Sequence, residues 1–254
     1  MSSINRKAVE QAFETYTRQY QVSDPKIRLK IDHTYRVAGL CERIAETIPG
    51  LDKNLCWLSG MLHDIGRFEQ VRRYNTFSDA DSVDHATFGA ALLFQEKLLD
   101  SFGTFEQDHV EILETAIRNH NRFRIDDAVK EPCRTYCNIL RDADKIDILR
   151  VNYETPFEDI YNVPESEMKQ AAVSDAVKQN FLEGHAILRS VRKTPADTLV
   201  SHISLVHELV FPISIRIVKE QGYLDKLLAF QSENEETVSW FTIMRETLAA
   251  KQLI

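Results

Sequence analysis

The sequence lacks several features that would assign it to a membrane or to an oxidising compartment. No apolar run approaches the roughly 18 to 20 residues of a membrane-spanning helix, and the first residues, MSSINRKAVEQAFETY, lack the apolar core of a secretory signal. No two of the four cysteines form a C-x-x-C pair, and each lies in an apolar helical pattern: Cys41, Cys56, Cys133 and Cys137. We therefore expect reduced core thiols and a cytoplasmic location.

Positive charge is also in short supply. The chain has 31 Lys and Arg residues against 39 Asp and Glu residues, so its formal net charge is −8. An acidic surface argues against partners such as extended nucleic acid or an anionic membrane. A small anionic ligand remains compatible with this composition, because a single pocket can be locally basic.

Strand signals are almost absent. Runs of alternating β-branched residues do not occur, and neither do Asn-Gly or Asp-Gly hairpin turns. Apolar residues instead recur with helical spacing nearly from end to end. The sequence therefore predicts an all-α protein whose 254 residues form a single domain, 1–254, with a sizeable core.

The expected helices follow this apolar spacing and its stop signals. Pro49-Gly50 ends one helix, and Gly66 is expected to end the next. Residues 67–83 look like a long loop, a length at which loops are usually functional or mobile. The helices are expected at about 4–20, 25–47, 52–65, 84–100, 106–120 and 132–151, followed by a connection at 152–164 and four or so further helices in 165–254.

The pair His63-Asp64 is the most informative feature that the sequence does have. It stands at the end of an apolar helix, directly before Ile65 and Gly66. An imidazole and a carboxylate in such surroundings are costly unless something satisfies them, and a divalent metal would do so. A local hydrogen bond between the two side chains explains the pair, taken alone, about as well.

Two other polar residues, His33 and Asp144, lie on the apolar stripes of their expected helices. A lone inward His is more often a core residue than a metal ligand. A carboxylate on a buried stripe, in contrast, needs a cation or strong hydrogen bonds. Asp147 shares the helix face of Asp144, whereas Asp142 is expected to face solvent.

Two histidines stand at expected helix ends. His85 opens a helix with Gly89 one turn further on, which leaves room for another helix or a ligand. Asp84 is expected to cap this helix, ahead of a role in orienting the histidine. His120 ends a helix among arginines that indicate either a solvated basic face or a phosphate pocket: Arg118, Arg122 and Arg124. The other histidines are expected to be structural or at the surface: His109, His185, His202 and His207.

Taken in order, these residues resemble the H…HD…D signature of the HD-domain superfamily of metal-dependent phosphohydrolases. The signature residues are His33, His63-Asp64 and Asp144. The strings Leu-His-Asp-Ile-Gly and Arg-Asp-Ala-Asp-Lys-Ile-Asp around them also resemble the family's usual contexts. The resemblance covers about 25–150 and implies an all-α core of about five helices. Extra helices are expected at the N-terminus and in a C-terminal extension over about 165–254.

The resemblance extends to members of the family that hold two metals. In this comparison His85 and His120 match the additional histidines of such members. One metal would be held by His33, His63, Asp64 and Asp144, and Asp64 would bridge to a second metal held by His85 and His120. The ions would be Fe, Mn, Co, Ni or Zn, one or two per chain. The GYP tripeptide of the branch that hydrolyses cyclic dinucleotides is missing, and Arg67 stands where that branch has Lys.

The resemblance implies an enzyme, a phosphomonoesterase or phosphodiesterase, that acts on a nucleotide or another small phosphate ester. A metal-bound hydroxide would attack phosphorus, with Asp64 shared between the metals as a catalytic residue. Arg67 would hold a phosphate oxygen, as a catalytic and substrate-binding residue. Further substrate-binding residues would be Arg122, Lys145 and Asp147.

Two alternatives stay open at this point. A di-iron oxygenase of HD fold would use the same four His and two Asp residues, and oxygen consumption would favour it. A non-catalytic nucleotide-binding regulator would normally have lost a signature ligand, and none is missing here. The sequence does not determine the substrate or the oligomeric state.

Overall fold

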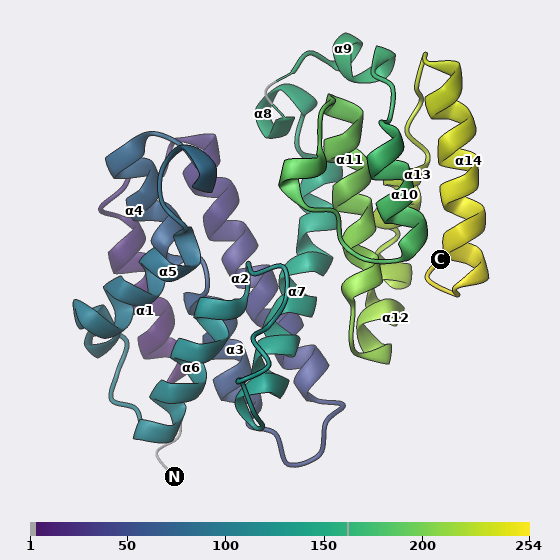
Figure 1. Ribbon diagram of the computed structural model, residues 1–254. Coiled ribbons are helices and arrows are strands. Elements are labelled where there is room, and N and C mark those ends of the chain that lie inside the picture. Colours follow the sequence, from purple (N-terminus) through teal and green to yellow (C-terminus); the bar gives the residue numbers. More distant parts are fainter. Residues whose placement is uncertain (1–3, 162) are drawn as a thin grey trace. The chain divides into compact units, whose positions relative to one another are not determined.

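The computed structural model describes residues 4–161 and 163–254, and these residues form helices and connections without any strand (Figure 1). This confirms the all-α prediction. The chain divides into two compact units, 1–144 and 145–254. The organisation of both units as a single domain stays a prediction. Among the described helices, none is both long enough and apolar enough to cross a membrane.

The first unit contains the long helices that the apolar spacing predicted. They are α1 (Arg6–Thr17), α2 (Pro25–Ala45), α3 (Lys53–Leu62), α4 (Ile65–Tyr74), α5 (His85–Ala90), α6 (Gln107–Asn119) and the first half of α7 (Cys133–Glu154). Three of them begin at an aspartate whose carboxylate accepts a backbone N–H of the first turn: Asp24 for α2, Asp52 for α3 and Asp84 for α5. Asp84 is therefore a helix cap, as predicted.

Helix α4 corrects the expectation of a loop over 67–83. The helix was hidden because two of its buried positions are polar, which breaks the apolar period. Glu69 accepts hydrogen bonds from Arg72, Arg73 and Tyr20, and the fully buried Gln70 bonds to the following segment. Only 75–84 is a connection, and it contains a single 3₁₀ turn, Asp79–Asp81.

Gly66 does not end a helix, contrary to expectation, but lies in the first turn of α4. A Cβ there would overlap the carbonyl oxygen of His85 and the backbone nitrogen of Gly89, and a Cβ on Gly89 would lie 3.0 Å from the Gly66 nitrogen. Glycines at both positions therefore let α4 and α5 touch through their backbones. This confirms that Gly89 leaves room for another helix beside His85.

The helix expected over 84–100 is broken into shorter pieces. After α5 the chain forms a π-helical turn at Ala91–Gln95 and a 3₁₀ turn at Leu98–Ser101. Between these turns Lys97 has a left-handed backbone, with φ of 61°, which a continuous helix does not allow. The cysteines are free, and Cys41, Cys56 and Cys137 are buried.

In the second unit, 165–254 contains more and shorter helices than the four or so expected, and a short helix lies within the expected connection 152–164. After the second half of α7 come α8 (Phe157–Tyr161), α9 (Glu165–Gln170), α10 (Asp175–Glu183), α11 (Pro195–Ile203), α12 (Pro212–Gln221), α13 (Tyr223–Leu228) and α14 (Glu235–Ala250). Several span only one or two turns, too short for a helical period to show in the sequence. Prolines open α11 and α12, and left-handed glycines, Gly184 and Gly222, end α10 and α12.

Candidate metal centre

All six side chains predicted as metal ligands meet within the first unit. His33 comes from α2, His85 from the start of α5, His120 from the end of α6 and Asp144 from α7. His63 and Asp64 form the junction between α3 and α4. The four histidines and Asp64 are buried, and the potential ligand atoms form two groups that share Asp64: His33, His63 and Asp64, and Asp64, His85 and His120.

The first group surrounds one oxygen of Asp64. The Nε2 atoms of His33 and His63 lie 3.7 and 3.6 Å from Asp64 Oδ2. The same two nitrogens lie 3.1 and 3.8 Å from Oδ1 of Asp144. Two imidazoles and two carboxylates therefore face a common centre, in a mixture of ligands that suits a divalent transition metal.

The second group surrounds the other oxygen of Asp64. Here the Nε2 atoms of His85 and His120 lie 3.4 and 3.8 Å from Asp64 Oδ1. The carboxylate of Asp64 thus has one oxygen directed toward each pair of histidines. Asp64 is thus the residue that the two candidate groups share.

The hydrogen bonds of the imidazoles test whether the residues fit a metal. His63 Nδ1 lies 2.7 Å from the Gly60 carbonyl oxygen, and His120 Nδ1 lies 2.7 Å from that of Ile117, so Nδ1 carries the proton in both. In the neutral rings the Nε2 atoms of His63 and His120 are then unprotonated. Nε2 of His63 lies 3.3 Å from Nε2 of His33, and Nε2 of His120 lies 3.0 Å from Nε2 of His85. His85 also donates from Nδ1, to Asp79, so the neutral rings of His85 and His120 bring two Nε2 lone pairs within 3.0 Å of each other. Two lone pairs this close favour a cation between them, so the donor set fits a metal.

The turn between α3 and α4 allows His63 and Asp64 to serve one site. Helix α3 ends at Leu62, and Asp64 leaves helical geometry with φ of −100° and ψ of 15°. On a continuous helix two neighbouring side chains would point about 100° apart. Asp64 precedes α4 without using its side chain as a cap, so its carboxylate is available to the site.

The electrostatics of the site keep its carboxylates charged. Burial alone would raise the pKa of Asp64, but the ammonium group of Lys30 and the neighbouring imidazoles of His63 and His85 hold that pKa well below its usual range. The pKa of Asp144 is also lowered, against its burial, by a hydrogen bond and charge from His33.

The pKa values of three of the histidines are also lowered, which favours their neutral form. Burial lowers the pKa of His85 and of His120 to about 4, and it lowers the pKa of His63 as well. At neutral pH these imidazoles are therefore neutral while the carboxylates are ionised. Metal ligands need both of these protonation states.

Sequence reasoning missed two charged residues at the centre. The Nζ atom of Lys30 lies 2.7 Å from Asp64 Oδ2, and its position one turn before His33 on α2 was a signal that could have revealed it. Asp79 accepts a hydrogen bond from His85 at 2.7 Å. It lies in a polar connection where no periodicity marks it.

Arg67, predicted to bind phosphate, lies beside the centre. Its Nη1 atom donates to Asp79, to Gln70 and to the Phe77 carbonyl oxygen at 2.6 to 2.9 Å. Its Nε atom lies 3.7 Å from Asp64 Oδ1 and is buried without a hydrogen-bond partner among the described residues. The guanidinium is thus held through Nη1, and its Nε–H remains available as a donor next to the site.

The other predicted substrate contacts differ in their surroundings. Arg122 is exposed, donates to the Arg118 carbonyl oxygen and lines a cavity of about 650 Å³ that none of the six candidate ligands lines. Lys145 and Asp147 follow Asp144 on α7 and are buried. The substrate-binding roles of these three residues stay predictions. Asp142 is fully buried, so its expected exposure was wrong.

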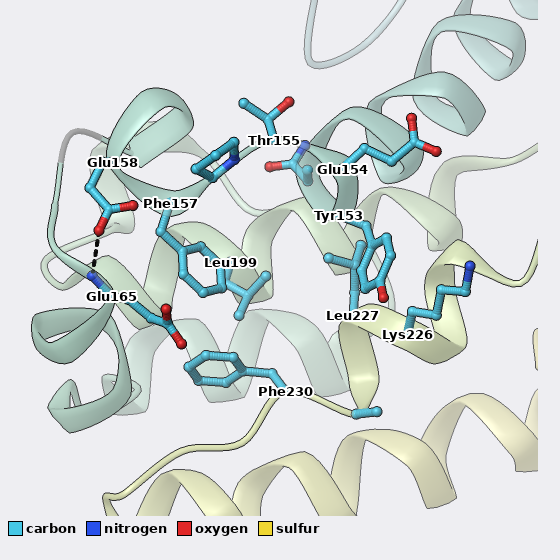
Figure 2. A pocket seen from close by; sticks show the side chains of 13 residues that line it. Tyr153, Glu154, Thr155, Phe157, Glu158, Glu165, Leu199, Lys226, Leu227 and Phe230 are labelled. Atoms are coloured by element: carbon cyan, nitrogen blue, oxygen red, sulfur yellow. Dashed lines mark hydrogen bonds between the residues drawn. The ribbon is translucent and has the colours of Figure 1, made fainter.

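A second cavity, of about 580 Å³, lies in the 145–254 unit (Figure 2). The rings of Phe157 and Phe230 meet edge to face, with centroids 5.7 Å apart, and Lys226 lies over the Tyr153 ring at 5.0 Å. None of the predicted site residues lines this cavity. Two of the remaining histidines pack on aromatic rings, His202 on Tyr161 and His207 on Phe181.

Comparison with known proteins bears on most of the first unit and on the middle of α7. The family model of the HD domain matches residues 31–149, a stretch that contains all six candidate ligands. No curated protein and no solved structure gave a significant match to the chain.

Proposed function

We propose that this chain, whose residues 31–149 match the HD-domain family, is a metal-dependent phosphohydrolase acting on a nucleotide or another small phosphate ester. One observation carries the proposal: the two oxygens of Asp64 face separate pairs of histidines, with Oδ2 toward His33 and His63 and Oδ1 toward His85 and His120. Two ions that shared this carboxylate would act together on one phosphate group, as the ions of two-metal hydrolytic sites do.

The residues of the chain divide the work of the site. His33, His63 and Asp144 would hold one ion, His85 and His120 the other, and Asp64 both. When bound, such ions supply Lewis acidity, which lowers the pKa of water and offsets charge on phosphate oxygens. Burial of the ligands excludes bulk water and strengthens every charge interaction in the site.

Arg67 supports the choice of a phosphate as substrate. Its buried Nε donor points to the neighbourhood of Asp64 without a partner among the described residues, and a guanidinium N–H is a good donor to a phosphate oxygen. The contacts of Nη1 with Asp79 and Gln70 keep the side chain in place. Arg67 would thus orient a phosphate group against the ions.

The experiment that tests the proposal measures phosphate release by metal-depleted protein reconstituted with Mn²⁺, Co²⁺, Zn²⁺ or Fe²⁺. Substrates would include nucleoside monophosphates and bis(p-nitrophenyl) phosphate, each with and without oxygen. We expect metal-dependent turnover that oxygen does not change. Asp64→Asn should reduce turnover by at least about 100-fold, because loss of a ligand should cost no less than loss of a group that supports one.

Asp32→Asn is the matched control, because Asp32 is an exposed aspartate next to His33 on α2. It should retain full turnover. Turnover that required oxygen would instead indicate an oxygenase. A protein that bound the metals and any of these nucleotides without turnover would be a binding module, and either result would contradict the proposal.

A further inference from the structure

The candidate ligands differ in how their imidazole rings are held. His63 and His120 each donate from Nδ1 to the carbonyl oxygen three residues earlier, that of Gly60 and of Ile117. Both stand at the C-terminal end of a helix, α3 or α6, where such a carbonyl lies within reach. Their own helices therefore fix these two rings.

His85 has no such support from its own helix. It is the first residue of α5, so the residue three positions earlier, Ser82, lies outside the helix. Its Nδ1 atom instead donates to Oδ2 of Asp79 at 2.7 Å. A side chain from the connection between α4 and α5 thus does for His85 what the backbone does for His63 and His120.

Asp79 is itself held firmly against α4. Its Oδ1 atom accepts from Arg67 Nη1 at 2.7 Å and from Gln70 Nε2 at 3.0 Å. The fully buried Gln70 also donates to Ser82 Oγ and to the Val83 carbonyl oxygen, both at 2.9 Å. The segment that carries Asp79 is therefore fastened at several points between α4 and His85.

We propose that Asp79 is a positioning residue for one of the two metal positions, the one formed by Asp64, His85 and His120, and that it sets the metal affinity of this position. It does not set the metal affinity of the other position, at His33, His63 and Asp144. A carboxylate on Nδ1 fixes the tautomer and the orientation of the ring and makes Nε2 a stronger ligand. This inference rests on the metal centre of the proposed function. It adds that the two positions have separate supports and are separately adjustable.

The test titrates the whole metal-depleted chain with Co²⁺ alone. Calorimetry and the visible absorption of the bound ion measure the binding. The wild type should bind two equivalents. Asp79→Ala should weaken one of them by about 10- to 100-fold and leave the other unchanged. Asp79→Asn, which loses the charge and keeps one acceptor oxygen for the donors of His85, Arg67 and Gln70, should weaken the same equivalent by a smaller factor.

Two further variants assign the affected equivalent to its position. In a His33→Ala background the position of His85 and His120 remains, and Asp79→Ala should weaken it. In a His120→Ala background the position of His33 and His63 remains, and Asp79→Ala should not alter it. Asp81→Ala is the matched control, an exposed aspartate in the same 3₁₀ turn, and it should bind both ions as the wild type does.

Equal weakening of both equivalents by Asp79→Ala would overturn the inference, and so would no weakening of either, or a wild type that binds a single ion. If Asp79→Ala does not fold, Asp79→Asn decides by the same criteria. The outcome is independent of catalysis. A protein that binds Co²⁺ as expected but hydrolyses no phosphate ester would contradict the proposed function and leave this inference standing.

Discussion

At the scale of single residues, the centre depends on how the charge of Asp64 is balanced. The side chain of Asp64 is 3% exposed, and the ammonium group of Lys30 lies 2.7 Å from its Oδ2 atom. That oxygen is also the one directed toward His33 and His63. Lys30 therefore stabilises the carboxylate in the protein without metal, and a bound ion would take over much of that role.

Lys30→Met is predicted to separate these two contributions. Without metal, the variant should lose about 1–3 kcal/mol of unfolding free energy, because a nearly buried carboxylate loses its closest cation. Added Co²⁺ should raise the melting temperature more in the variant than in the wild type, since the ion no longer faces a neighbouring ammonium. Thermal melts with and without Co²⁺ measure both effects.

Lys26→Met provides the control, because Lys26 is exposed one turn earlier on the same helix. It should melt as the wild type does under both conditions. If Lys30→Met were as stable as the wild type without metal, or gained less from Co²⁺, Lys30 would not be the balancing charge of Asp64.

At the scale of elements, pairs of small residues set the spacing of the helices that carry ligands. Gly66 and Gly89 bring α4 and α5 together next to Asp64 and His85. On α3, a Cβ at Gly60 would lie 2.6 Å from the Ala38 Cα atom of α2, so these two helices also meet closely. The distances between ligands are thus consequences of backbone contact, which a single methyl group would disturb.

Gly66→Ala is predicted to force α4 and α5 apart. The added Cβ meets backbone atoms of His85 and Gly89, which cannot rotate away as a side chain can. We expect a loss of about 1–3 kcal/mol in the unfolding free energy of the metal-free protein. Co²⁺ affinity should fall more at the metal position of His85 and His120 than at the position of His33 and His63. Urea denaturation and Co²⁺ titration measure the two effects.

The chain offers a matched glycine for comparison. Gly39 lies inside α2, and nothing lies within 4 Å of a Cβ built on it. Gly39→Ala should be neutral or should stabilise the protein by up to about 1 kcal/mol, because alanine favours helix. Equal stability of the two alanine variants would show that the contact between α4 and α5 adapts, contrary to the prediction.

At the scale of the whole molecule, all candidate ligands belong to one of the two compact units, 1–144. The chain has two tryptophans, Trp57 in this unit and Trp240 in the other, and both are buried. Each can therefore report the unfolding of its own unit by fluorescence, if the other is replaced.

Metal binding is predicted to stabilise the two units unequally. At a concentration 100 times its dissociation constant, a ligand that binds only the folded state adds about 2.7 kcal/mol. In Trp240→Phe, where Trp57 reports, Co²⁺ should raise the denaturation midpoint clearly. In Trp57→Phe, where Trp240 reports, the rise should be smaller. Identical shifts would show that the whole chain unfolds as one cooperative unit.

Much of this fold was predictable because its signals are local. Helices α2, α3 and α6 follow an apolar period over ten or more residues, and aspartates mark the first residues of α2 and α3. Helix α4 was missed because Glu69 and Gln70 are buried through partners that the sequence does not reveal. The helices of 165–254 were underestimated in number because several are very short.

The six candidate ligands were predicted from the sequence, through the order of their residue types and the resemblance of that order to the HD-domain superfamily, because residue type and order are properties of the chain itself. Only the tertiary structure decided that the oxygens of Asp64 are divided between two pairs of histidines, that Gly66 meets Gly89, and that Asp79 supports His85. The physical reason is that periodicity specifies which face of a helix is buried. What that face contacts depends on how segments far apart in the chain pack together.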